Sequence, residues 1–190
     1  MAARIRPTVE PAARGTVPRG LADRRLPWAA GFFTVAVLLH NADHIRRGAG
    51  TVTWEVFWLG TFAVPVEIGI VLLVCARHRS APLLAAAGGF TLAVGYLVVH
   101  FLPTWSAVSD SFASADNVSP LSWSAASLEV VAAMVLALAG WNALEARRAT
   151  SVVVRAGEPP LWSAARHPVA LVMTLGNLTI LTVAFVQRFG

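Results

Sequence analysis

Charged side chains are scarce in this sequence, at 13% of its residues, and lysine is absent, so all 15 basic groups are arginine. Soluble domains carry about 25% charged residues, roughly twice this share. Most of the chain therefore lacks the side chains that cover a water-exposed globular surface. Hydrophobic residues take their place, at 56% of the sequence. They are gathered in long runs, which indicates an integral membrane protein.

Cysteine is nearly absent as well. Cys75 is the single cysteine, which excludes an intramolecular disulfide. The sequence also contains no phosphate-binding loop, no dinucleotide fingerprint and no serine-nucleophile motif. These absences exclude the enzyme classes that are easiest to read from a sequence. They leave open whether the protein is an enzyme.

Five apolar stretches are long enough to cross a bilayer. A hydrocarbon core of about 30 Å needs about 20 apolar residues as a helix, and helices satisfy every backbone polar group internally. We therefore predict an all-α, polytopic membrane protein with five transmembrane helices in a compact bundle. The spans are about 27–47, 53–75, 82–103, 122–144 and 168–188. They form one predicted domain, 27–190, which follows an arginine-rich segment, 1–26, that we predict to be a disordered basic cytoplasmic tail.

The arginines set the predicted orientation. With the tail inside the cell, 12 of the 15 arginines lie on the inner side, and Arg46, Arg47 and Arg188 lie outside. The positive-inside rule therefore predicts a cytoplasmic N-terminus, an outer C-terminus and insertion in the cell (plasma) membrane. This placement accounts for the net charge of +5 without nucleic acid. The predicted partners are membrane lipids and either a second copy of the chain or another membrane protein.

Several polar side chains interrupt the apolar spans. They are His40, Asp43, His44, Glu67, His100, Glu129 and Asn177. Ionisable groups inside a membrane are costly, which makes them candidates for function. At a rise of about 1.5 Å per residue, the three histidines and Glu129 lie within about 12 Å of the outer boundary. Small residues share their helix faces, and such faces let membrane helices pack closely. We therefore expect these groups to meet in the outer half of the bundle.

The spacing of two histidines favours a metal site. His40 and His44 are four residues apart, the arrangement that forms a bidentate arm on a helix. Glu129 would add a carboxylate and His100 a fourth ligand, a set found at zinc and non-haem iron sites. The sequence thus predicts a transition-metal pocket, for zinc or iron, made by His40, His44, Glu129 and His100.

The segment HNADH, residues 40–44, resembles the H-x-x-E-H motif of inverzincin-type peptidases, with Asp43 where that motif has glutamate. In that motif the acid between the two ligands is the general base. The resemblance covers five residues. It implies that Asp43 is a catalytic residue.

Three other interpretations of the same polar groups stay open. In the first, Asp43 pairs with Arg47 and Glu129 with a histidine, which fixes the helix register of a structural or accessory membrane subunit. In the second, His100 and a histidine of the first span hold a haem. In the third, Glu67 and Asn177, at similar depth, form a proton relay for coupled transport.

Overall fold

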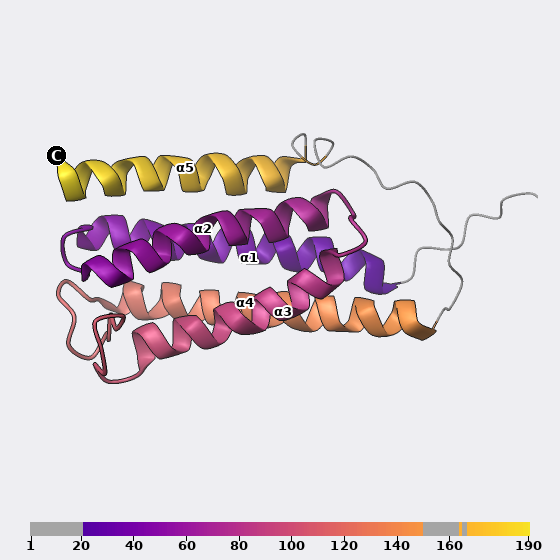
Figure 1. The fold of residues 1–190 in the computed structure, drawn as a ribbon, viewed down its shortest axis with the longest axis horizontal. Helices are drawn as coiled ribbons and strands as arrows, with labels where there is room; N and C mark the ends of the chain where they lie inside the picture. Colours follow the sequence, from indigo (N-terminus) through magenta and orange to yellow (C-terminus); the bar gives the residue numbers. More distant parts are fainter. Residues whose placement is uncertain (1–20, 150–163, 165–166) are drawn as a thin grey trace, which may run out of the picture.

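The computed structural model describes residues 21–149, 164 and 167–190. These residues form an all-helical bundle in which consecutive helices run in opposite directions along the long axis (Figure 1). Its elements are α1 (Leu21–Arg47), α2 (Trp54–Cys75), α3 (Ala81–Tyr96), the π-helical turn η1 (Leu97–Phe101), α4 (Pro120–Ala149) and α5 (Pro168–Phe189).

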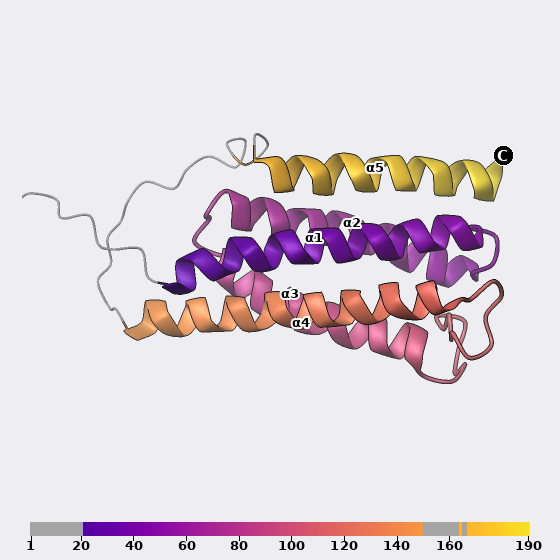
Figure 2. The same cartoon turned by 180° about the vertical axis from the view of Figure 1, so that it is seen from behind.

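One end of the bundle carries the α1–α2 turn, the loop 102–119 and the C-terminus (Figure 1). We call it the loop end. Helix α1 packs against α4, α5 and α2, whereas α3 packs mainly against α4 (Figure 2). The last turns of α1 therefore reach the loop end with other helices on several sides.

Small residues bring α3 and α4 into backbone contact. A Cβ atom on Gly89 would lie 2.7 Å from the carbonyl oxygen of Ala133, and one on Gly140 would lie 2.6 Å from the amide nitrogen of Ala86. Neither position has room for a side chain. The small-residue faces of the third and fourth predicted spans are thus packing faces, as the sequence predicts.

The outward faces of the helices are apolar. Phe62, Leu175 and Val186 are each more than half exposed, an arrangement that water disfavours and lipid accepts. Among the described residues, four helices are long and apolar enough to cross a membrane: α2, α3 continued through η1, α4 and α5. These long apolar helices are compatible with a membrane protein.

All five predicted spans are helical, but α1 is not among the four helices that are long and apolar enough to cross a membrane. Its last two turns carry His40, Asp43 and Arg47, which lower its mean hydropathy. The fifth crossing and the orientation of the bundle therefore stay predictions.

The first helix begins earlier than the sequence predicts. Residues 1–20 of the predicted tail lie outside the described residues, but residues 21–26 are the first turns of α1. Leu26 is buried in the core with Ala29 and Ala30, and this burial favours continuing the helix upstream of Pro27. Residues 150–163, 165 and 166, between α4 and α5, also lie outside the described residues.

Candidate metal centre

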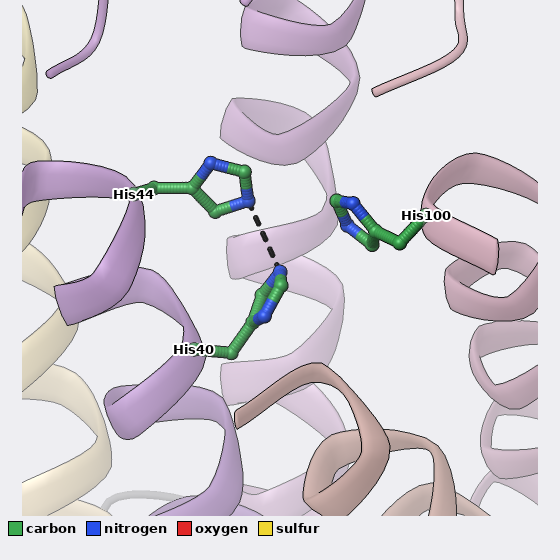
Figure 3. A group of neighbouring side chains, drawn as sticks. All are labelled: His40, His44 and His100. Carbon is green, nitrogen blue, oxygen red and sulfur yellow. Dashed lines mark hydrogen bonds between the residues drawn. The ribbon is translucent and has the colours of Figure 1, made fainter. Parts of the chain in front are cut away.

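His40 and His44 lie one turn apart near the end of α1. Residues four apart share a helix face, so both rings project from α1 in the same direction (Figure 3). Their Nε2 atoms are 3.0 Å apart. Because His40 is 3% exposed, this contact lies inside the bundle.

His100 approaches the same point from η1. A π-helical turn is wider than an α-helical one and is common at functional sites. The His100 ring centroid lies 4.7 Å from that of His40 and 5.5 Å from that of His44. One ligand atom from each of the three residues lies within 4.8 Å of the other two. We call His40, His44 and His100 the His group; Figure 3 shows its rings converging from two sides.

Glu129 of α4 stands beside the His group. Its side chain is 1% exposed, and its Oε2 atom lies 3.6 Å from Nε2 of His40. Ligand atoms around a tetrahedral metal, with bonds of about 2.0–2.1 Å, are about 3.3 Å apart. The His40–His44 and His40–Glu129 distances lie on either side of this value. The group whose ligand atoms all lie within 4.8 Å of one another is formed by the three histidines, and Glu129 contacts it through His40.

Asp110, in the loop 102–119, contacts the Nδ1 atom of His100. Nδ1 of His100 is 3.3 Å from the backbone oxygen of Asp110 and 3.4 Å from its Oδ2 atom. Histidines that bind metals usually donate their second ring N–H to a carboxylate or a carbonyl. This contact orients the ring and leaves Nε2 of His100 free to act as a ligand.

Asp110 is itself fixed by Arg47. The guanidinium donates two hydrogen bonds to the carboxylate, of 2.7 and 2.8 Å, and both side chains are buried. Burial alone would raise the pKa of Asp110, but the hydrogen bonds from Arg47 and His100 hold it well below its ordinary value. The carboxylate therefore stays ionised at neutral pH. The predicted pairing of Arg47 with Asp43 is wrong, because the loop supplies a partner that the sequence spacing does not reveal.

Asp43 of α1 forms an ion pair with Arg46. Its Oδ1 atom accepts a 2.8 Å hydrogen bond from Nε of Arg46, and Arg46 also donates to the hydroxyls of Ser119 and Ser122. The carboxylate thus helps to attach α1 to the start of α4. Its predicted catalytic role stays a prediction.

The loop 102–119 covers the site. The backbone N–H groups of Asp110 and Phe112 donate to the carbonyls of Val99 and His100, which satisfies the last turn of η1. The Phe112 ring is buried, with its centroid 4.7 Å from that of His100. Phe112 could not be predicted as a site residue, because a loop has no regular spacing that places an aromatic ring.

Glu67 and Asn177, the predicted proton relay, each have a separate partner. The Tyr96 hydroxyl donates a 2.6 Å hydrogen bond to Oε1 of Glu67. Oδ1 of Asn177 accepts a 2.8 Å bond from Nδ2 of Asn41. The structure thus connects Glu67 to Tyr96, the last residue of α3 before the η1 turn that carries His100, and it connects Asn177 to α1. Tyr96 was missed as a site residue, although it shares a helix face with His100.

No protein-family model, curated protein or solved structure matches this chain. Among the described residues, the fold and the site show an all-helical bundle that has a cluster of three histidines and four helices long and apolar enough to cross a membrane. The protein's function has to be argued from the site itself.

Proposed function

We propose that this is a multi-pass membrane protein that binds one transition-metal ion through His40, His44 and His100, with the Glu129 carboxylate beside them. The observation that carries the proposal is the His group itself, in which ligand atoms from α1 and η1 lie within 4.8 Å of one another. Exposed histidines meet by chance, but His40 and His100 are 3% and 4% exposed. Gathering three imidazoles in such a place needs a compensating interaction.

A buried polar atom beside the His group supports a metal over a purely structural cluster. Oε2 of Glu129 has no hydrogen-bond partner. Buried clusters that only fix helix register are expected to satisfy their atoms, because each unpaired one costs free energy. A cation beside the Nε2 atoms would compensate the Glu129 carboxylate directly.

The donor set favours zinc or iron. Three imidazoles that leave a coordination position open are typical of catalytic zinc, and imidazoles with a carboxylate also bind ferrous iron. A haem fits less well. The His40 and His100 rings are already in contact, with their centroids 4.7 Å apart, and a macrocycle held by both would have to lie between them.

The arrangement of α1 supports a fifth membrane crossing. Helix α1 runs along the same axis as the four apolar helices and packs against three of them (Figures 1 and 2). A bilayer that contains those helices would also contain α1. With the arginine distribution, this favours a cytoplasmic N-terminus, a plasma-membrane location and a metal site in the outer half.

Metal analysis of the purified full chain, prepared with a tag that contains no histidine, tests the proposal. We expect stoichiometric zinc or iron in the wild type, and loss in the His40→Ala, His44→Ala double variant and in His100→Gln. The controls are His78→Ala and His167→Ala, which alter the two histidines outside the His group. They should keep the metal.

Size-exclusion chromatography separates loss of metal from loss of folding. Monodisperse variants that lack the metal support the site. Equal metal content in the wild type and the double variant would overturn it. So would a wild type that takes up neither zinc nor ferrous iron, and a structural subunit would then be the better interpretation.

A further inference from the structure

A cavity of about 290 Å³ leads to the His group. Its walls come from α2, α3 and α5, and α1 and α4 contribute residues at its inner end. Most of the lining is apolar, for example Phe57, Val64, Leu92, Val99 and Leu181. Such a surface accepts a hydrocarbon chain and offers little to a polar solute.

The ionisable residues of the cavity are ones already described at the site. The His group, Glu67 and Glu129 all line it. A molecule in the apolar part would therefore have one end next to the candidate metal ligands.

The cavity opens toward the side of the bundle. Gly60 of α2 and Gly95 of α3 line it. Both are exposed, and a Cβ atom on either would have no atom within 4 Å. Figure 1 shows α2 and α3 meeting near their connecting turn and diverging toward the loop end. In a membrane the exposed positions Gly60 and Gly95, which line the cavity, would face acyl chains, so a ligand could enter between them from the bilayer.

The polar atoms at the inner end restrict the head group. Oε2 of Glu67 and Oε2 of Glu129 have no hydrogen-bond partner, and the two side chains are 3% and 1% exposed. Within the described part of the chain, the residues that line the cavity include no arginine or lysine. The site therefore offers hydrogen-bond acceptors and lacks a side-chain cation for a phosphate or carboxylate head group.

We propose that this cavity binds a single-chain lipid alcohol from the bilayer, with its hydroxyl donating to Glu67 or Glu129 beside the His group. The cavity volume of about 290 Å³ lies just below the range of about 300–1,000 Å³ for small-molecule pockets, so it suits one hydrocarbon chain rather than two. The inference deepens the proposed function, and it rests on that function where it takes the His group as a metal centre. The binding of the lipid's hydrocarbon chain depends only on the cavity and not on a metal.

Photolabelling of the full chain in phosphatidylcholine nanodiscs tests the proposal. The probe is dodecan-1-ol with a diazirine near the far end of its chain, and labelled peptides are located by mass spectrometry. We expect labelling of the α2 and α3 walls that falls about tenfold, equivalent to about 1.4 kcal/mol of binding, in Gly60→Leu and in Gly95→Leu. Unlabelled dodecan-1-ol should compete, and dodecane and dodecanoate should not.

Gly69→Leu is the matched control. Gly69 lies on the same helix as Gly60, also has open space at its Cβ position, and does not line the cavity, so this variant should label like the wild type. In Glu67→Gln, where a carboxylate oxygen is replaced by an amide donor, the preference for the alcohol over the alkane should decrease.

Metal content measured on the same samples distinguishes the two possible failures. If the metal is bound but labelling is the same in Gly60→Leu, Gly95→Leu and Gly69→Leu, the lipid-alcohol site is overturned and the metal centre stands. Equal competition by dodecane would also overturn the hydroxyl assignment. Cavity-specific labelling without any metal would support the lipid site and overturn the metal centre.

Discussion

Among the single residues at the site, Glu129 is the one whose charge matters most. A divalent ion bound by three neutral imidazoles keeps its full charge, which is costly to bury in an apolar bundle. The Glu129 carboxylate, 1% exposed and 3.6 Å from His40, would neutralise part of that charge. It would do so whether it binds the ion directly or stands next to it.

We therefore predict that Glu129→Gln lowers metal affinity by about 10- to 100-fold, the usual effect of removing a supporting carboxylate. The amide has nearly the same shape, so the fold should be retained. A competition titration against a chelator of known affinity measures the change. Glu145→Gln is the control, because Glu145 is exposed and pairs with Arg148. Equal affinities in the two variants would show that Glu129 has no part in holding the ion.

Residue-level prediction from the sequence succeeded where local geometry decides the outcome. His40 and His44 share a helix face because they are four residues apart within one rigid helix. The approach of His100 followed from its depth and from the small residues on its helix face. The partner of Arg47 could not be predicted, because Asp110 lies 63 positions away in a loop. No periodicity connects the two.

At the scale of helices, the contact between α3 and α4 positions both His100 and Glu129. The two glycines that permit this contact, Gly89 and Gly140, bring backbone against backbone. Any added atom at the contact would force the helices apart. The same movement would separate η1 from α4 and thus pull the site open.

We predict that Gly89→Ala destabilises the protein by about 1–3 kcal/mol, the usual cost of overpacking, because its Cβ would lie 2.7 Å from a backbone oxygen of α4. Thermal unfolding in detergent measures the change. Gly95→Ala, on the same helix, is the control. Its Cβ would have no atom within 4 Å, so its stability should stay equal or rise by up to about 1 kcal/mol. If the two variants unfold at the same temperature, the contact is looser than the structure indicates.

The helices themselves were predictable because long apolar runs leave the backbone no alternative in lipid. The residues at which the helices begin and end were less predictable. Helix α1 starts before Pro27 because Leu26 is buried in the core, which is a tertiary effect. The π-helical form of residues 97–101 leaves no mark in the sequence, and neither does the fold of the loop that caps it.

For the whole molecule, the central question is how the bundle lies in a membrane. Its described N-terminal helix starts at the end opposite the C-terminus (Figure 1). At about 1.5 Å per residue, the 27 residues of α1 extend about 40 Å, enough to cross a bilayer core of about 30 Å. Five crossings would place the loop 102–119 and the C-terminus on the same side of the membrane, which is the outer side in the orientation predicted from the arginines. If α1 instead lay along the membrane surface, it could not keep its packing against α4 and α5.

We predict that Ala113→Cys and Arg79→Cys, each made in a Cys75→Ser background, label from opposite sides of the membrane. Ala113 is exposed in the loop 102–119, and Arg79 is exposed in the turn between α2 and α3, at the other end of the bundle. In intact cells a membrane-impermeant maleimide should react with Ala113→Cys and not with Arg79→Cys. Permeabilised cells, in which both should react, provide the control. Labelling of Arg79→Cys alone in intact cells would reverse the orientation and move the His group to the cytoplasmic half. Labelling of both in intact cells would contradict a spanning bundle, because the α3–η1 segment that joins the two positions would then not cross the bilayer.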